Sequence, residues 1–154
     1  MKNLSDYSRV VRFGETDAGG VVYFTELLRF CHEAYEEELA AAGVDVKAFF
    51  SRDGVSTEKD CAVAVPIVHT QADFYRPMFC GDRITISLTS KLLTPDSFEI
   101  TYKVFESSES ANGRKVAKAL TRHVAIQTAS RHRCPLPGYL TDWIAAQSEP
   151  SELI

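Results

Sequence analysis

The sequence lacks the features of a membrane protein and of a disulfide-stabilised secreted protein. No apolar run approaches the roughly 18 residues that a membrane-spanning helix needs. The opening stretch "MKNLSDYSRVV" has no apolar signal-peptide core, so we expect a cytoplasmic protein without membrane insertion. The cysteines form no CxxC pair, which favours reduced, partly buried thiols over a zinc site or disulfides. They are Cys31, Cys61, Cys80 and Cys134.

Positive charge is also in short supply. The chain has 17 Lys and Arg against 21 Asp and Glu, a net charge of −4 that argues against nucleic acid as a partner. A local basic patch can still hold an anionic small ligand. The 154 residues are 45% hydrophobic and 25% charged, a composition typical of one globular domain. No linker or repeat divides 1–154, so we expect a single domain.

Several familiar catalytic motifs are missing as well. The chain has no GxSxG nucleophile elbow, no GxGxxG fingerprint and no P-loop. "HEAYE" lacks the second histidine of zinc proteases, so His32 and Glu36 are more typical of a solvated helix face than of a ligand pair. His69 and His123 fall in strand-like runs, where a hydrogen-bonded structural histidine is the ordinary interpretation. We therefore expect neither a metal nor an organic cofactor.

The hydrophobic pattern predicts a strand, one long helix and then four strands. "YSRVVRF" at 7–13 is typical of a short strand. Over 23–43 apolar residues recur every three or four positions, which predicts a helix that ends at Gly43. The later runs alternate with period two and cover 62–77, 82–93, 97–107 and 114–128.

Turn residues and a final helix complete this pattern. Pro66 indicates an edge strand or a bulge, Thr94–Asp96 a β-turn and Asn112–Gly113 a hairpin. A short helix is predicted near 139–147. The order indicates an α+β fold in which one long helix covers one face of an antiparallel sheet. The other face and the strand edges need a partner, so we expect a homo-oligomer.

The stretch "RFGETDAGGVVYF" at 12–24 places two carboxylates and three glycines between the first strand and the long helix. One interpretation is structural: Asp17 caps a turn and the glycines supply positive φ angles. The other is catalytic: Asp17 attacks a substrate carbonyl or activates water, and N–H groups at the helix start polarise that carbonyl. Glu15 either raises the proton affinity of Asp17 by charge repulsion or faces solvent.

Basic residues offer candidates for contacts with phosphate groups. Arg76 follows two aromatic residues in "FYRP", and Lys91 follows a strand-like run. Two basic clusters, at 114–118 and 131–133, are ordinarily solvated surface, but either can meet phosphates.

The loop and the helix together resemble a known family. "VRFGETDAGGVVYF", followed by "HEAYE", is similar to the 4-hydroxybenzoyl-CoA thioesterase branch of the hotdog superfamily. That family carries Asp-x-x-Gly-(Val/Ile)-Val-(Tyr/Trp) ahead of its long helix, and "DFYRPMFCGDRITI" resembles its strand-turn segment. The resemblance covers the chain from about Tyr7 to Gln127. The matching positions are Asp17, Gly20, Val21, Val22 and Tyr23.

The resemblance implies a hotdog fold, in which a five-stranded antiparallel sheet wraps around one long central helix, with a core at about 7–129 and a C-terminal extension at 130–154. It implies hydrolysis of an acyl-CoA by Asp17, as nucleophile or general base, with the backbone N–H of Phe24 polarising the carbonyl. It also implies a dimer with each site between subunits, and we expect two dimers to form a tetramer. With the basic candidates included, the expected substrate-binding residues are Gly20, Val21, Tyr23, Arg76 and Lys91.

Within that branch, the flanking residues are most similar to the 1,4-dihydroxy-2-naphthoyl-CoA thioesterases of phylloquinone and menaquinone biosynthesis. Those sequences commonly read Asp-Ala-Ala-Gly, where this chain has Gly19 in place of the second alanine. The resulting "DAGGVVY" is shared with the Tol-Pal-associated short-chain acyl-CoA thioesterases, which usually carry His at the position of Phe24. The alternatives are a 4-hydroxybenzoyl-CoA or short-chain acyl-CoA thioesterase and a non-catalytic acyl-CoA-binding protein.

Overall fold

The structure is a computed structural model that describes residues 6–51, 55–56, 62–107 and 113–148. Cys61 and Asn112, the first residue of the predicted hairpin, lie outside the described residues. By its contacts the chain divides into two compact units. The first unit contains residues 1–38, 71–88 and 101–120, and the second contains the remaining residues. The expectation of one domain over 1–154 stays a prediction.

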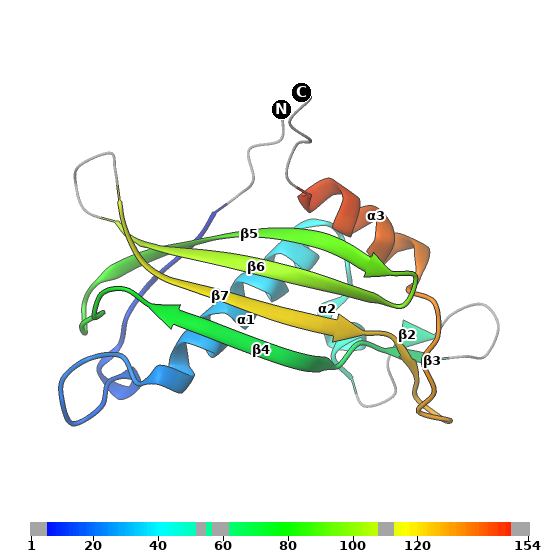
Figure 1. The fold of residues 1–154 in the computed structure, drawn as a ribbon, viewed down its shortest axis with the longest axis horizontal. Helices are drawn as coiled ribbons and strands as arrows, with labels where there is room; N and C mark the ends of the chain where they lie inside the picture. Colours follow the sequence, from blue (N-terminus) through cyan, green and yellow to red (C-terminus); the bar gives the residue numbers. More distant parts are fainter. Residues whose placement is uncertain (1–5, 52–54, 57–61, 108–112, 149–154) are drawn as a thin grey trace. The chain divides into compact units, whose positions relative to one another are not determined.

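The larger sheet has five strands in the order β1-β5-β6-β7-β4, and Figure 1 shows β5, β6, β7 and β4 side by side. β1 runs antiparallel to β5, with Tyr7 opposite Ile86. β7 and β4 are also antiparallel, because Val124 donates to the carbonyl of Pro66 at one end and Tyr75 donates to that of Val116 at the other. The predicted α+β class with a five-stranded antiparallel sheet is confirmed. The strands are β1 Tyr7–Val10, β4 Ile67–Phe74, β5 Arg83–Thr94, β6 Ser97–Glu106 and β7 Arg114–Val124.

Period-two alternation explains which side of this sheet forms the core. In β5 every second residue from Ile84 to Ser90 is buried, and the residues between them are not. β6 repeats the pattern, with Ile100, Tyr102 and Val104 almost fully buried. Successive side chains of a strand point to opposite faces, so this alternation puts one face of the sheet in the core.

Helix α1 (Phe24–Ala41) supplies the apolar layer of the first unit. Leu27, Phe30 and Cys31 lie on one side of the helix and have no exposed surface. The helix ends at Ala41, and Gly43 closes it as the predicted C′ glycine with a φ of 86°. Gly43 donates to the carbonyl of Ala40 and Val44 to that of Leu39, both at 3.0 Å, which is the hydrogen-bond pattern of a Schellman cap.

The prediction of one extended run over 62–77 is wrong at Pro66. The structure ends β3 (Ala62–Ala64) before the proline and begins β4 after it. Proline has no N–H to donate to a sheet, so it separates two strands that pair with different partners. A second sheet, β2-β3-β8, contains β3 together with β2 (Val55–Ser56) and β8 (Ile126–Gln127). β4 is an edge strand, as Pro66 indicated.

Two further helices belong to the second unit. α2 (Val46–Phe49) has no signal in the hydrophobic pattern because it is only four residues long. α3 (Gly138–Gln147) confirms the predicted helix near 139–147 and buries Trp143 and Ile144. No helix among the described residues is long and apolar enough to cross a membrane. Among the described cysteines, Cys31 is buried, Cys80 is exposed and Cys134 lies between the two.

The cap of α1 leads to a stability prediction. Gly43→Ala should lower the free energy of unfolding by about 1 kcal/mol, because an L-residue is strained at a φ of 86°. Chemical denaturation measures this loss. Gly14→Ala is the matched control, because an added Cβ meets no atom within 4 Å at either position. Of these two glycines, only Gly43 has a positive φ. Equal losses in the two variants would contradict the prediction.

Candidate active site

The segment between β1 and α1 is a tight hairpin closed by backbone hydrogen bonds. Asp17 donates to the carbonyl of Val21 at 2.8 Å, and Gly20 donates to that of Asp17 at 2.9 Å. Thr16 forms an isolated β-bridge with Val22. Gly20 has a φ of 80°, which a residue with a side chain rarely adopts. Of the three glycines in the loop, Gly20 alone has the positive φ that the structural interpretation expected.

The carboxylate of Asp17 lies at the exposed tip of this hairpin. One of its oxygens, Oδ1, accepts the N–H of Gly19 at 2.8 Å. This bond confirms that Asp17 caps the turn, and it also fixes the direction of the carboxylate. A Cβ on residue 19 would lie 3.1 Å from Oδ1, so Gly19 leaves this oxygen more room than an alanine would. The structural and catalytic interpretations of Asp17 are therefore compatible.

The same hairpin delivers the chain to the start of α1. Tyr23 donates to the carbonyl of Glu15 at 2.9 Å, and Phe24 is the first helical residue. The N–H groups of a helix's first turn have no carbonyl partner within the helix and carry partial positive charge. The N–H of Phe24 belongs to this set, so a helix-start N–H and a carboxylate lie within one short stretch of chain, residues 17–24.

A cavity of about 280 Å³ adjoins the loop. It brings together Val21 and Arg76, two of the residues predicted to bind substrate. Val22 closes one side by donating to the carbonyl of Met78 at 2.8 Å. Lys91 is exposed in β5, belongs to the second unit and is not among the described residues that line this cavity. The full lining is Val21, Val22, Phe74, Tyr75, Arg76, Pro77 and Met78.

Aromatic side chains of the first unit are unusually exposed near the loop. Phe24 is 62% exposed and Tyr23 is 46% exposed, and their rings meet edge to face with centroids 4.9 Å apart. Exposed apolar residues that gather in one region are typical of a ligand site or an interface. The set comprises Phe13, Tyr23, Phe24, Phe74, Tyr75 and Phe79.

Glu15 does not face solvent, contrary to one of the two expectations for it. It is 6% exposed, it pairs with the guanidinium groups of Arg9 and Arg29, and it accepts the N–H of Arg12 at 2.8 Å. Burial by itself would raise the pKa of this carboxyl, but the Arg12 N–H and the two guanidinium groups outweigh it and lower the pKa. Two cations thus balance the negative charge of Glu15. The expectation that Glu15 repels the charge of Asp17 did not include these cations.

His32 and His123 behave as the sequence indicated. His32 and Glu36 form an i,i+4 pair at 3.0 Å on the surface of α1. His123 is fully buried, lies 2.8 Å from the hydroxyl of Thr121 and stacks on Phe98. In the described part of the chain, no group of three or more His, Cys, Asp or Glu side chains is placed to hold a metal ion.

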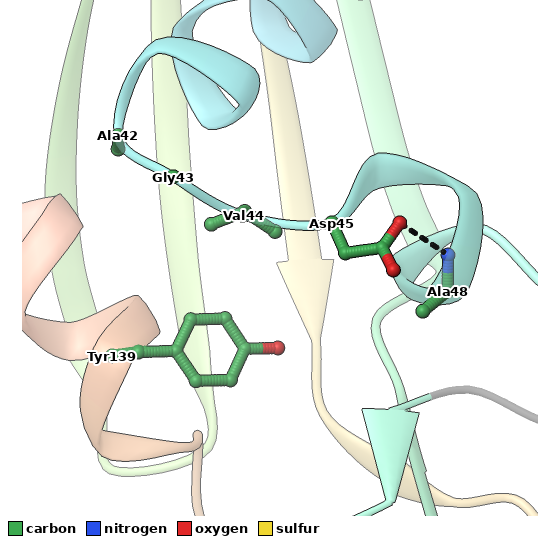
Figure 2. Close-up of a pocket in the computed structure, with 6 residues that line it drawn as sticks. All are labelled: Ala42, Gly43, Val44, Asp45, Ala48 and Tyr139. Atoms are coloured by element: carbon green, nitrogen blue, oxygen red, sulfur yellow. Dashed lines mark hydrogen bonds between the residues drawn. The ribbon is translucent and has the colours of Figure 1, made fainter.

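A second cavity, of about 260 Å³, lies in the second unit. Figure 2 shows the ring of Tyr139 facing the segment 42–45. Burial raises the pKa of the Tyr139 phenol. The Asp45 carboxylate in the wall is engaged as the N-cap of α2, accepting the N–H groups of Lys47 and Ala48. None of the predicted site residues is among the described residues that line this cavity, so the loop at Asp17 is the better candidate.

The low pKa of Glu15 has a consequence for stability. Because its pKa is lower in the folded chain than the ordinary value of 4.5, the carboxylate stabilises the fold above about pH 4.5, and this contribution disappears as the pH falls through the folded-state pKa. Glu15→Gln should therefore lose about 2 kcal/mol at pH 7, and the gap to wild type should shrink towards pH 3.

Urea unfolding at several pH values measures this gap. Glu37→Gln, an exposed change on α1, is the control and should match wild type throughout. A gap for Glu15→Gln that stays constant from pH 7 to pH 3 would contradict the assignment.

Comparison with known proteins matches this chain to a family and to full-length relatives. The sequence pattern of the thioesterase-like superfamily matches residues 11–147. A 1,4-dihydroxy-2-naphthoyl-CoA hydrolase from Rippkaea orientalis is 46% identical over 149 residues, which cover 97% of this chain and 100% of that protein. The hydrolase of the same name from Synechococcus elongatus is 44% identical over 143 residues, covering 92% and 96%.

Solved structures give the same result. The crystal structure of a 1,4-dihydroxy-2-naphthoyl-CoA thioesterase from Synechocystis has a TM-score of 0.80 at 34% identity, covering 94% of this chain and 98% of that one. The hotdog fold implied by the sequence is therefore confirmed. Matched by the family pattern over most of its length and by full-length relatives, the chain belongs to the thioesterase-like superfamily.

Proposed function

We propose that this thioesterase hydrolyses 1,4-dihydroxy-2-naphthoyl-CoA to 1,4-dihydroxy-2-naphthoate and CoA. The observation that carries the chemistry is the exposed carboxylate of Asp17 on a hairpin that runs directly into the first turn of α1. The near full-length similarity to hydrolases of that name supports the choice of acyl group. The cytoplasmic location expected from the N-terminal sequence stays a prediction.

In the proposed reaction the thioester carbonyl approaches the start of α1. The N–H of Phe24 donates to the carbonyl oxygen, where negative charge develops during attack, and the helix dipole adds to this stabilisation. Asp17 either attacks the carbonyl carbon or takes a proton from an attacking water. If Asp17 attacks, the carbon–sulfur bond breaks and leaves a mixed anhydride between Asp17 and the acyl group, which water then hydrolyses to the acid and the free Asp17 carboxylate. If Asp17 is the base, the water oxygen adds to the carbonyl carbon and the carbon–sulfur bond breaks. In both routes one water is consumed, and one of its protons leaves on sulfur as the CoA thiol.

The neighbouring cavity suits the acyl-CoA. Val21 and the rings of Tyr23 and Phe24 offer apolar surface for a flat aromatic acyl group. Arg76 is the basic residue of the cavity and is our candidate for a CoA phosphate. The proposal for Lys91 rests on its exposed position in β5 alone. Gly20 contributes through the backbone shape of the hairpin rather than through a contact of its own.

We also propose that the smallest active assembly is a dimer, with a tetramer formed from two dimers. The edge strand β4 carries this proposal because all its residues except Ala72 are exposed, including the apolar Ile67 and Val68. The other edge strand, β1, alternates between half-buried and exposed residues. An apolar, unpaired strand edge is stabilised by pairing with a second copy.

Sedimentation tests the assembly. Wild type should sediment as a dimer or a larger species at micromolar concentration, and Val68→Lys should shift it towards monomer and lower its activity. Val10→Lys places the same change on the other edge strand, β1, and should leave the assembly intact. An active wild-type monomer, or dissociation caused equally by both variants, would contradict the proposal.

The role of Asp17 is tested by Asp17→Asn. The amide keeps the size and the ability to accept the Gly19 N–H but removes both the nucleophile and the base. We expect kcat for the naphthoyl thioester to fall about 10³-fold, with no effect of EDTA on wild type. Turnover of purified proteins, followed as release of free CoA thiol, measures this loss.

Phe24→Leu is the matched control, because it keeps the backbone N–H and removes only the ring. It should keep kcat within a few-fold while changing KM or acyl preference. Near wild-type turnover by Asp17→Asn would contradict the catalytic role and favour a non-catalytic acyl-CoA-binding protein. A wild-type enzyme that ignores the naphthoyl thioester and hydrolyses short aliphatic ones would contradict the choice of substrate.

A further inference from the structure

The buried carboxylate of Glu15 lies where β1, the hairpin and α1 meet. From β1, Arg9 reaches it with Nη2, which lies 2.6 Å from Oε2. From α1, Arg29 also pairs with Oε2. A third contact comes from the start of the loop, where the N–H of Arg12 donates to Oε1 at 2.8 Å. One side chain thus ties three segments of the first unit together.

The strand-side partner is itself held in place. The side chain of Arg9 is 11% exposed, and its guanidinium lies 3.9 Å from the centre of the Phe30 ring. Glu33 of α1 takes another nitrogen of Arg9 at 2.9 Å. A guanidinium that is buried, stacked and doubly paired has little rotamer freedom, so Glu15 is held by a rigid group.

Arg29 is the more exposed of the two partners. Its side chain is 53% exposed, and its Nε also donates to Glu26 at 2.6 Å. Removing Arg29 therefore costs less packing than removing Arg9, while it still removes one of the two cations at Glu15.

The backbone of Glu15 adds a second connection to the loop. Its carbonyl accepts the N–H of Tyr23 at 2.9 Å. Glu15 therefore lies at the start of the hairpin and is also bonded to its far end. Asp17 is two residues after Glu15, and Phe24 immediately follows Tyr23. A rotation of Glu15 therefore moves the Asp17 carboxylate relative to the N–H of Phe24.

We infer that Glu15 is a positioning residue for thioester hydrolysis, which holds Asp17 and the N–H of Phe24 in register by anchoring the hairpin to Arg9 and Arg29. This inference rests on the proposed function of Asp17. Glu15 does not touch the substrate, because its carboxylate is buried and engaged by three donors. A displacement of reacting groups by about 1 Å is enough to cost about 10²-fold in rate.

Two substitutions separate positioning from general support of the fold. Glu15→Gln and Glu33→Gln each remove one carboxylate from the same arginines without changing its size, but only Glu15 belongs to the loop. We expect Glu15→Gln to lower kcat by about 30-fold or more with KM within about three-fold, and Glu33→Gln to keep kcat within about two-fold. Melting temperatures measured alongside should fall in both variants.

Arg29→Gln extends the test in case Glu15→Gln folds poorly. It should lower kcat by several-fold, whereas Glu26→Gln, which removes a partner of Arg29 that lies outside the loop, should not. Losses of kcat that follow the fall in melting temperature equally in all four variants would overturn the inference, because a merely structural role gives that result.

Amide hydrogen exchange supplies a readout that does not depend on turnover. Glu15→Gln should speed exchange at the N–H groups of Asp17, Gly20 and Tyr23, which the hairpin protects in wild type, and Glu33→Gln should not. If Asp17→Asn keeps full activity, the proposed function fails while the exchange result still tests the anchor. Unchanged exchange in a folded Glu15→Gln, with Asp17→Asn inactive, would overturn the inference and leave the proposed function standing.

Discussion

The ion pairs of one buried carboxylate determine how the first strand of this protein passes into its long helix. Glu15 is surrounded by a guanidinium from β1, a guanidinium from α1 and a backbone N–H, and burial makes each of these contacts stronger than it would be in water. A charge buried in this way is tolerated only when it is paired and hydrogen-bonded. The hairpin that carries Asp17 is therefore attached at a point where the chain has few alternative conformations.

The residues proposed to carry out the chemistry lie only a few positions after Glu15 in the chain. The hairpin needs a residue with positive φ, which Gly20 supplies, and a carboxylate that caps the turn, which Asp17 supplies. The same capping bond orients the group that we propose as nucleophile or base. The helix begins at Phe24, whose N–H we propose as the donor to the carbonyl oxygen. A thioester is already activated towards attack, so a carboxylate and such donors form a sufficient set.

Much of the fold could be predicted because it depends on local periodicity. The apolar spacing of α1, its Gly43 cap and the alternation of β5 and β6 are each visible within about 20 residues. α2 could not be predicted, because four residues are too few to show a period. The division at Pro66 depends on which strands pair with β3 and β4, and pairing is not a local property.

The site shows the same limit. Asp17 and the glycines are adjacent in sequence, so the motif was recognisable, and the structure adds the turn geometry that the motif requires. The burial of Glu15 could not be predicted, because its two ion-pair partners come from six positions before it and fourteen after it. The spacing of Arg9, Glu15 and Arg29 carries no periodic signal. Val21 and Arg76 line one cavity because the loop contacts the segment 74–79, and this contact between distant parts of the chain has no local signal in the sequence either.

The most direct test of the account is a crystal structure with a naphthoyl-CoA analogue in which a methylene group separates the carbonyl from the sulfur, so that it cannot be hydrolysed. We expect the carbonyl oxygen to accept the N–H of Phe24 at about 2.9 Å. We also expect the Asp17 carboxylate to lie within about 3.5 Å of the carbonyl carbon or of a water beside it. A carbonyl bound away from the start of α1, for example in the cavity beside Tyr139, would contradict it.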